Sequence, residues 1–227
     1  IARSAAIHHD MTMVFFSLEM GRTELAMRVL SAEGRISMGR LKKGDLDQEG
    51  WTNLATLQGK ITGAPLFIDD SPNMTLMEIR AKCRRLKQRN QLQLVVLDYL
   101  QLMSSGKKVE SRQQEVSEFS RSLKLLAKEL EVPVIALSQL NRGSEQRTDK
   151  RPMISDLRES GSIEQDADMV ILLHREDMYN PDSDRVGEAD MIIAKHRGGP
   201  TKTIPLAFSG KYSRFNNMAS ETPPQQY

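Results

Sequence analysis

The sequence predicts an α/β domain, in which helices cover both faces of a mostly parallel sheet and an antiparallel extension follows toward the C-terminus. The 227 residues suit one domain of ordinary size, and a composition of 39% hydrophobic and 27% charged residues is typical of a globular chain. In the first part of the chain, β-rich runs alternate with helix-length segments, as they do in parallel sheets. In the last part, β-rich runs follow one another with turn residues between them.

The first part of the chain contains four β-rich runs, at residues 13–17, 65–68, 94–97 and 132–137. The run Leu-Val-Val-Leu at 94–97 is apolar throughout. A strand that is buried on both faces has this pattern, whereas a strand with one wet face alternates. We therefore predict that 94–97 is a central strand.

Three segments between these runs repeat their apolar residues at helical spacing: 23–35, 76–89 and 116–130. Segment 76–89 places Cys83, the only cysteine, within its apolar stripe. We expect a buried, inert thiol there, and a lone cysteine permits neither an internal disulfide nor a cysteine metal site. This cysteine usage indicates a reducing cytoplasm.

The runs at 169–173, 189–194 and 203–206 are separated by the turn signals Asn-Pro-Asp at 180–182 and Gly-Gly-Pro at 198–200. They predict an antiparallel extension on the edge of the sheet.

Two polar segments complete the predicted organisation. The stretch 143–151 has no apolar side chain, and we expect a mobile loop. We expect one domain over residues 1–218 and a disordered tail over 219–227.

Overall charge and hydropathy exclude some classes of protein. The formal net charge is only +2, so a nucleic-acid site must come from local clusters rather than from bulk charge. No apolar run approaches the roughly 18 residues of a membrane-spanning helix, so we expect no membrane partner.

Three predicted strands are followed by polar side chains at their C-terminal ends. Asp98 comes directly after the run 94–97, Glu19 follows 13–17, and Gln139 follows 132–137. Ligands bind outside these strand ends in open α/β sheets. Such an Asp holds Mg²⁺ in nucleotide hydrolases, such a Glu polarises water, and an amide senses a γ-phosphate. Each residue alone could equally cap a helix or begin a loop.

Two further segments carry chemistry that the residues alone leave open. The Ser-Gly-Ser sequence around Gly161, close to Arg158, could bring backbone N–H groups against a phosphate, or it could be a solvated loop. Lys195 and Arg197 at the end of a predicted strand could reach a neighbouring subunit's nucleotide, or they could belong to a basic hairpin turn.

Taken together, these segments resemble the C-terminal domain of DnaB-type replicative helicases. The resemblance runs from residue 1 to about residue 218. It is carried by FSLEM at 16–20, APLFIDDSPN at 64–73, DYLQLM at 98–103, SRQQEVSEFSRSLKLLAKELEVPVIALSQLNR at 111–142 and RPMISDLRESGSIEQDAD at 151–168. It implies a RecA-like P-loop NTPase core, a homo-hexameric ring, ATP and Mg²⁺ as cofactors, and movement along single-stranded DNA. Primase and a helicase loader are the implied protein partners.

The resemblance also implies roles for single residues around the nucleotide. Glu19 matches the family's catalytic glutamate, and Asp98 matches the aspartate that binds Mg²⁺. Gln139 matches the γ-phosphate sensor. Arg28 resembles the arginine that packs against the adenine.

Other matching residues would act on a neighbouring subunit or on DNA. Lys195 and Arg197 match the pair that reaches into the neighbour's ATP. Arg158, Glu159 and Gly161 match a loop that grips DNA phosphates.

The sequence departs from the family at one decisive place. A member carries a glycine-rich loop ending in Gly-Lys-Ser/Thr, which holds the phosphates and the metal, and no such loop occurs in the 227 residues. We therefore expect that the chain is a fragment and is inactive by itself.

Two rival functions stay open. One is a recombinase-type ATPase of the same fold, which pairs DNA instead of unwinding it. The other is a catalytically incomplete module that binds DNA or joins a helicase ring.

Overall fold

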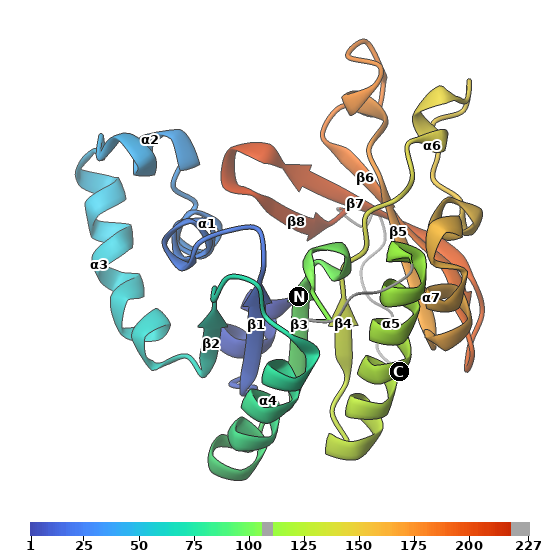
Figure 1. Ribbon diagram of the computed structural model, residues 1–227. Helices are drawn as coiled ribbons and strands as arrows, with labels where there is room; N and C mark the ends of the chain where they lie inside the picture. The colour runs from blue at the N-terminus through green and yellow to red at the C-terminus, as the bar shows by residue number, and fades with distance from the viewer. Residues whose placement is uncertain (106–110, 219–227) are drawn as a thin grey trace, which may run out of the picture.

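The computed structural model describes residues 1–105 and 111–218, with residues 158–160 described by their backbone only. It contains two four-stranded sheets. Figure 1 shows the parallel sheet at the centre, a helical arm of α2 and α3 on one side, and the antiparallel strands on the other. The predicted tail at 219–227 lies outside the described residues.

The parallel sheet has the strand order β2-β1-β3-β4. Its strands are β1 (Met13–Ser17), β2 (Leu66–Asp69), β3 (Leu94–Asp98) and β4 (Val134–Ala136). All three pairings are parallel, and β3 lies between β1 and β4 with four of its residues buried. The prediction of a central, buried strand at 94–97 is confirmed.

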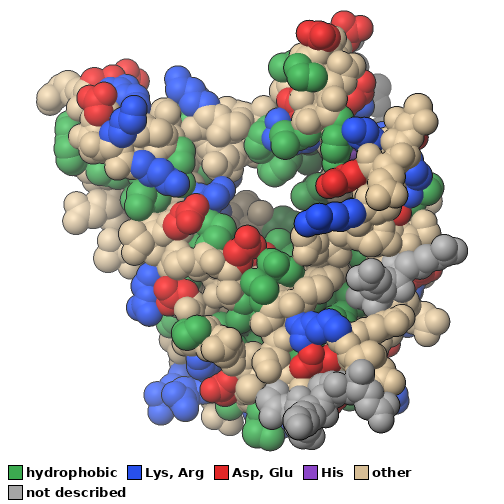
Figure 2. All heavy atoms as spheres, turned by 45° about the horizontal axis from the view of Figure 1, so that its top comes forward, with side chains coloured by type: hydrophobic (Ala, Val, Ile, Leu, Met, Phe, Trp, Pro, Cys, Tyr) green, Lys and Arg blue, Asp and Glu red, His purple; other side chains and the backbone are tan. Residues whose placement is uncertain are grey.

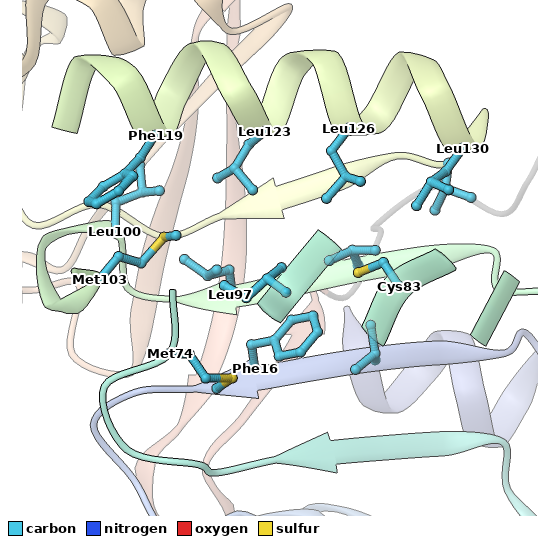
Figure 3. Packing of buried hydrophobic residues seen from close by; sticks show 14 of the residues in the cluster. Phe16, Met74, Cys83, Leu97, Leu100, Met103, Phe119, Leu123, Leu126 and Leu130 are labelled. Carbon is cyan, nitrogen blue, oxygen red and sulfur yellow. The ribbon is translucent and has the colours of Figure 1, made fainter. Parts of the chain in front are cut away.

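The main core fills one face of this sheet (Figure 3). It is closed by α4 (Leu76–Asn90) and α5 (Arg112–Leu130). The residues that these helices contribute to the main core are Ile79, Cys83, Phe119, Leu123, Leu126 and Leu130. They meet alternate strand residues such as Phe16 and Leu97, whereas Met13 and Val96 point to the opposite face.

The opposite face is covered by the start of the chain. A short π-helix, η1 (Ser4–His8), packs Ala5 and Ala6 against Met13, Leu94 and Val96. Helices therefore cover both faces of the sheet, as the alternation of segments predicts.

The two core helices begin at capping residues. Thr75 and Glu78 form a reciprocal capping box at the start of α4, and the Ser111 hydroxyl accepts a hydrogen bond from the Gln114 N–H at the start of α5. These caps satisfy N–H groups that have no partner within the helix. The helix predicted at 116–130 consequently begins earlier, at Arg112.

The antiparallel strands form a sheet of their own, with the order β5-β6-β7-β8. They are β5 (Met169–His174), β6 (Glu188–His196), β7 (Lys202–Ser209) and β8 (Arg214–Asn217). The antiparallel character is confirmed, but the placement on the edge of the first sheet is wrong. Among the described residues β4 pairs only with β3, and β5 pairs only with β6.

Several elements differ from the predicted ones. α1 (Arg22–Gly34) is confirmed, but α2 (Met38–Lys43), α3 (Gln48–Gly63) and β8 were not predicted. The helix α3 buries only Gly50 among its residues, although Trp51, Leu54, Leu57 and Ile61 recur along it at helical spacing. The sequence therefore offered a signal for this helix that the prediction did not use. The remaining elements are α6 (Gly143–Gln146), α7 (Gly161–Asp166), η2 (Leu100–Leu102), η3 (Ile154–Ser160), η4 (Glu176–Met178) and η5 (Gly210–Tyr212).

The polar stretch 143–151 is more ordered than a mobile loop. It contains the single helical turn α6, and its two arginines pair with buried carboxylates: Arg147 with Asp156, and Arg151 with Asp190. The absence of apolar residues therefore reflects anchoring by charge rather than by hydrophobic contact.

Among the described residues, no helix combines the length and the apolar character that crossing a membrane requires. Burial raises the pKa of the Cys83 thiol to about 12, which leaves it protonated and unreactive at neutral pH, as expected for a core thiol.

We expect Phe119→Ala to lower the free energy of unfolding by about 3–5 kcal/mol, because it leaves a cavity in the main core. Leu125→Ala is the matched control on the same helix, since Leu125 is 59% exposed, and it should change stability by about 0.5 kcal/mol or less. Urea unfolding of the three proteins measures both effects. Equal losses for the two variants would contradict the described orientation of α5.

Candidate active site at the carboxyl edge of the parallel sheet

The C-terminal ends of β1 and β3 meet at one edge of the parallel sheet. Ser17, the last residue of β1, lies directly beside Asp98, the last residue of β3. One further ladder bond continues past the strands, from the Leu18 N–H to the Asp98 carbonyl at 2.8 Å. Glu19 follows at once, so the structure brings the two predicted carboxylates to the same end of neighbouring strands.

Glu19 lies on a turn that the Ser17 side chain closes. The buried Ser17 hydroxyl donates to the Met20 carbonyl at 2.6 Å and accepts from the Met20 N–H at 3.2 Å. The turn directs the chain from β1 toward α1, while the Glu19 side chain stays exposed. A hydroxyl of this kind holds a turn in place of a regular backbone bond.

The Asp98 carboxyl is half-buried, and its surroundings disfavour a lone negative charge. Burial and the nearby Glu19 carboxylate raise the pKa of Asp98, while the positive charge of Arg28 lowers it by a smaller amount. No hydrogen bond or ion pair within the described part of the chain involves this carboxylate. A desolvated carboxylate without a partner is a fitting ligand for a divalent cation.

Arg28 reaches the site from α1. It donates a hydrogen bond to Glu24 on the same helix at 3.1 Å, and its charge acts on Asp98. The predicted residues Glu19, Asp98 and Arg28 thus form one electrostatic group, although nothing in their contacts identifies an adenine pocket.

Gln139 lies just beyond β4, where the side chain of Gln101 holds its backbone. Gln101 accepts from the Gln139 N–H at 3.2 Å and donates to the Gln139 carbonyl at 3.2 Å. Gln101 also donates to the Ser138 hydroxyl at 2.9 Å. Because Gln101 belongs to η2, three residues after Asp98, it ties the end of β4 to the end of β3.

Gln101 is a site residue that the sequence analysis missed. The only signal for it is its polar character inside DYLQLM, where the neighbouring Leu100 and Met103 are buried. Its role becomes visible only when β3 and β4 are placed side by side.

Lys195 and Arg197 lie apart from these carboxylates, at the end of β6 in the second sheet. Their side chains donate to carbonyl oxygens at the C-terminal end of α7: Lys195 to Glu164 and Gln165, and Arg197 to Gln165 at 2.6 Å. Cations are favoured at this end of a helix. Within one chain, therefore, the structure does not bring the two cations to Asp98 and Glu19.

The predicted phosphate-gripping loop is helical. The backbone of Arg158 and Glu159 belongs to η3, and Gly161 begins α7. The prediction of a loop is therefore wrong in its conformation. Gly161, at the junction of η3 and α7, has right-handed helical backbone angles, so the two helical segments follow each other without an intervening loop.

The carboxyl edge of the sheet is also hollowed. Figure 2 looks toward this side of the molecule and shows a depression rimmed by basic and acidic side chains. One pocket there lies beside Gln139 and is lined by Gln101, Arg112, Asn141 and Asp156, among others.

The described residues contain no group of three or more His, Cys, Asp or Glu side chains able to hold a metal ion. A cation at Asp98 would therefore have one protein carboxylate and would need other ligands. Mg²⁺ fits this arrangement, because it is usually bound by one or two carboxylates together with substrate phosphates and water.

Fold and site together define a class of protein: a RecA-like α/β domain with a carboxylate at the tip of each of two neighbouring parallel strands. The chain belongs to the family of DnaB-like helicase C-terminal domains, whose profile matches residues 1–217.

Named relatives agree with this assignment. The chain is 69% identical over 218 residues to the replicative DNA helicase DnaB of Leifsonia xyli subsp. xyli, covering 96% of this chain and 48% of that protein. It is 63% identical over 217 residues to the replicative DNA helicase DnaB of Mycobacterium leprae, covering 96% and 36%. The chain thus spans about half of these curated relatives or less.

Two solved structures share the RecA-like helicase fold. One, described as an ATPase domain, superposes with a TM-score of 0.91 at 41% identity, covering 96% of this chain and 78% of that one. A DnaB-like replicative helicase, described together with its interactions with primase, superposes with a TM-score of 0.89 at 42% identity, covering 93% and 51%.

The raised pKa of Asp98 predicts a specific dependence of stability on pH. The folded chain holds this proton more tightly than the unfolded chain, so ionising Asp98 costs stability as the pH rises through the interval above 3.8. Without divalent cations, Asp98→Asn should therefore be more stable than the unmodified chain at neutral pH, and the difference should shrink as the pH approaches 3.8.

Urea unfolding across this pH range measures the effect, and Asp182→Asn, at an exposed turn residue, controls for the substitution itself. A less stable Asp98→Asn protein at neutral pH would contradict the description of this carboxylate.

Proposed function

We propose that this chain is the motor part of a replicative DNA helicase. In this function, ATP hydrolysis at the subunit interfaces of a homo-hexameric ring drives movement along single-stranded DNA and unwinding of the duplex. The observation that carries the proposal is the convergence of Glu19 and Asp98 at the ends of neighbouring parallel strands. Family membership and the names of the relatives support it.

Each residue of the edge has a role in this proposal. Asp98 would hold Mg²⁺, whose charge offsets that of the β- and γ-phosphates when ATP is bound. Glu19, exposed on its turn, would orient and deprotonate the attacking water. Gln139 would sense the γ-phosphate, and Arg28 would pack against the adenine while its charge remains close to Asp98.

Lys195 and Arg197 would act on the ATP of the neighbouring subunit. Their separation from Asp98 within one chain supports action in trans, because a pair serving its own nucleotide would lie at the same edge. Cations of this kind stabilise the charge of the transferring phosphoryl group and contribute about 10³–10⁵ in rate.

Arg158, Glu159 and Gly161 would grip the phosphates of single-stranded DNA. A grip on the backbone needs no recognition of bases, which suits a motor that moves along any sequence. The structure of a relative described with primase supports primase as a partner. A helicase loader is proposed from the family resemblance, and a cytoplasmic location from the single cysteine.

A second candidate function is a catalytically incomplete module that binds DNA or joins a ring. The observation in its favour is that the 227 residues contain no glycine-rich phosphate loop. We expect the chain by itself not to hydrolyse ATP, so tests of catalysis use a longer protein that joins this chain to a segment with such a loop, called the full-length protein below.

In the full-length protein, Glu19→Gln should reduce ATP hydrolysis by at least about 10²-fold, because the amide cannot accept the proton of water. ATP binding should persist, since Glu19 is not assigned to hold the phosphates. Steady-state hydrolysis and binding of a fluorescent ATP analogue measure the two properties. Glu49→Gln, at an exposed position in the first turn of α3, is the control. Full turnover by the Glu19→Gln protein would refute the assignment.

Mixing two inactive proteins tests whether Arg197 acts between subunits. Arg197→Ala and Glu19→Gln proteins should each be inactive alone, but mixed rings contain interfaces with an intact Glu19 on one side and an intact Arg197 on the other. We expect hydrolysis to reappear after subunit exchange. If both single variants are inactive and no mixture regains activity, action in trans is excluded.

A further inference from the structure

The segment that follows β4 and the segment that carries Arg158 and Gly161 are joined through Asp156. The Asn141 N–H donates to the Asp156 carbonyl at 3.0 Å. Asn141 lies two residues after Gln139, and Asp156 lies two residues before Arg158. A single backbone hydrogen bond therefore links the predicted phosphate sensor to the predicted DNA segment.

Apolar contact reinforces this link. Leu157 is buried in a small cluster with Val170 and Leu172, and Leu140 packs against the same cluster. Since Leu140 follows Gln139 and Leu157 precedes Arg158, a displacement of one segment would disturb the other.

The Asp156 side chain holds this junction in place. It is only 4% exposed, and both of its oxygens accept from Arg147, Oδ1 from Nη1 and Oδ2 from Nη2, each at 2.8 Å. Oδ2 also accepts from the Met153 N–H at 2.8 Å, which fixes the start of η3. The bidentate pair between Arg147 and Asp156 fixes the orientation of the two side chains as well as their distance.

Arg147 is itself held by a second contact, which continues to the second sheet. Its Nη2 also donates to the Arg151 carbonyl at 2.9 Å, and the Arg151 guanidinium donates to Asp190 of β6 at 2.7 Å. Asp190 is 3% exposed and is paired with Arg185 as well. The junction is thus fastened to the second sheet by buried charges rather than by a flexible loop.

The electrostatics agree with this geometry. The hydrogen bond from Arg147 is the main cause that lowers the pKa of Asp156, and the same bond raises the pKa of Arg147. Asp156 therefore stays ionised throughout the neutral range, and its ion pair with Arg147 does not depend on pH there.

We propose that Arg147 and Asp156 are positioning residues that make the segment at 158–161 follow the position of Gln139. This inference rests on the proposed function, because it assumes that Gln139 responds to nucleotide and that 158–161 contacts DNA. Without the pair, η3 would lose its fixed register against Asn141. ATP hydrolysis would then continue, but DNA would no longer stimulate it.

The test measures ATP hydrolysis by the full-length protein with and without a single-stranded oligonucleotide. For Arg147→Ala we expect DNA-free hydrolysis and its KM to stay within about twofold of the unmodified protein. We expect the stimulation by DNA to fall about tenfold, which lies within the usual range of coupling between sites. Arg147→Lys keeps the charge but cannot form the bidentate pair. Its stimulation by DNA should lie between that of the unmodified protein and that of Arg147→Ala.

Two further variants keep the result interpretable. Arg147→Ala leaves a buried carboxylate unpaired, whereas Arg147→Met combined with Asp156→Asn removes both charges and should stay folded while losing stimulation. Arg175→Lys alters a similar two-pronged pair, with Asp177, that lies outside the junction, and it should keep full stimulation. Thermal melting verifies that each protein is folded.

The outcomes separate the two levels of the proposal. Normal stimulation in the folded Arg147 variants, or an equal fall in basal and stimulated rates, would overturn the positioning role and leave the helicase assignment intact. An unmodified protein that hydrolyses no ATP, or whose hydrolysis ignores DNA, would overturn the proposed function and this inference together.

Discussion

The parallel pairing of β1 with β3 is the constraint on which the site depends. Because Ser17 and Asp98 lie in register at the last pair of this ladder, Glu19 and Asp98 emerge at one edge. The register is held by burial on both faces: Phe16 and Leu97 point into the main core, while Met13 and Val96 point to the opposite face. A shift of the β1–β3 register by one residue would turn each apolar side chain to the other face, so hydrophobic packing fixes the positions of the Glu19 and Asp98 carboxylates.

The second half of the molecule is organised by a different interaction. Around the polar stretch 143–151, carboxylates that are almost fully buried pair with arginines, as Asp156 does with Arg147 and Asp190 with Arg151 and Arg185. The arginine pairs lower the pKa of Asp190 to about 2, so these ties persist at any physiological pH. Buried ion pairs contribute direction more than stability, since desolvation offsets much of their attraction. Such directional ties suit a segment that transmits position.

Much of the parallel sheet could be predicted from the sequence, because buried strands appear as short runs of consecutive apolar residues. The strand at 13–17 and the buried run before Asp98 are recognisable from apolar residues alone, and their polar successors mark the carboxyl edge. The arm of α2 and α3 was not predicted, although Trp51, Leu54, Leu57 and Ile61 recur at helical spacing within α3. These four residues are exposed or only partly buried in the structure, so α3 has an apolar stripe without a fully buried face.

The remaining differences arise from contacts between distant residues. Strands β5–β8 form a separate sheet. Which strand edges pair depends on contacts between distant residues, and the local residue pattern does not indicate it. Gln101 became a site residue only because β4 brings Gln139 beside it. The stretch 143–151 was expected to be mobile because its charges resemble those of a solvated loop, and their partners lie up to 52 residues away in the sequence.

In the proposed function, one nucleotide with its metal sits on the edge defined by Glu19 and Asp98. The most direct measurement is an experimental structure of the full-length protein with Mg²⁺ and a non-hydrolysable ATP analogue. We predict the metal beside the Asp98 carboxylate, directly or through a bound water, and the γ-phosphate facing Glu19, with Lys195 and Arg197 of an adjacent subunit on its other side. A nucleotide bound at any other edge of the sheet would contradict it.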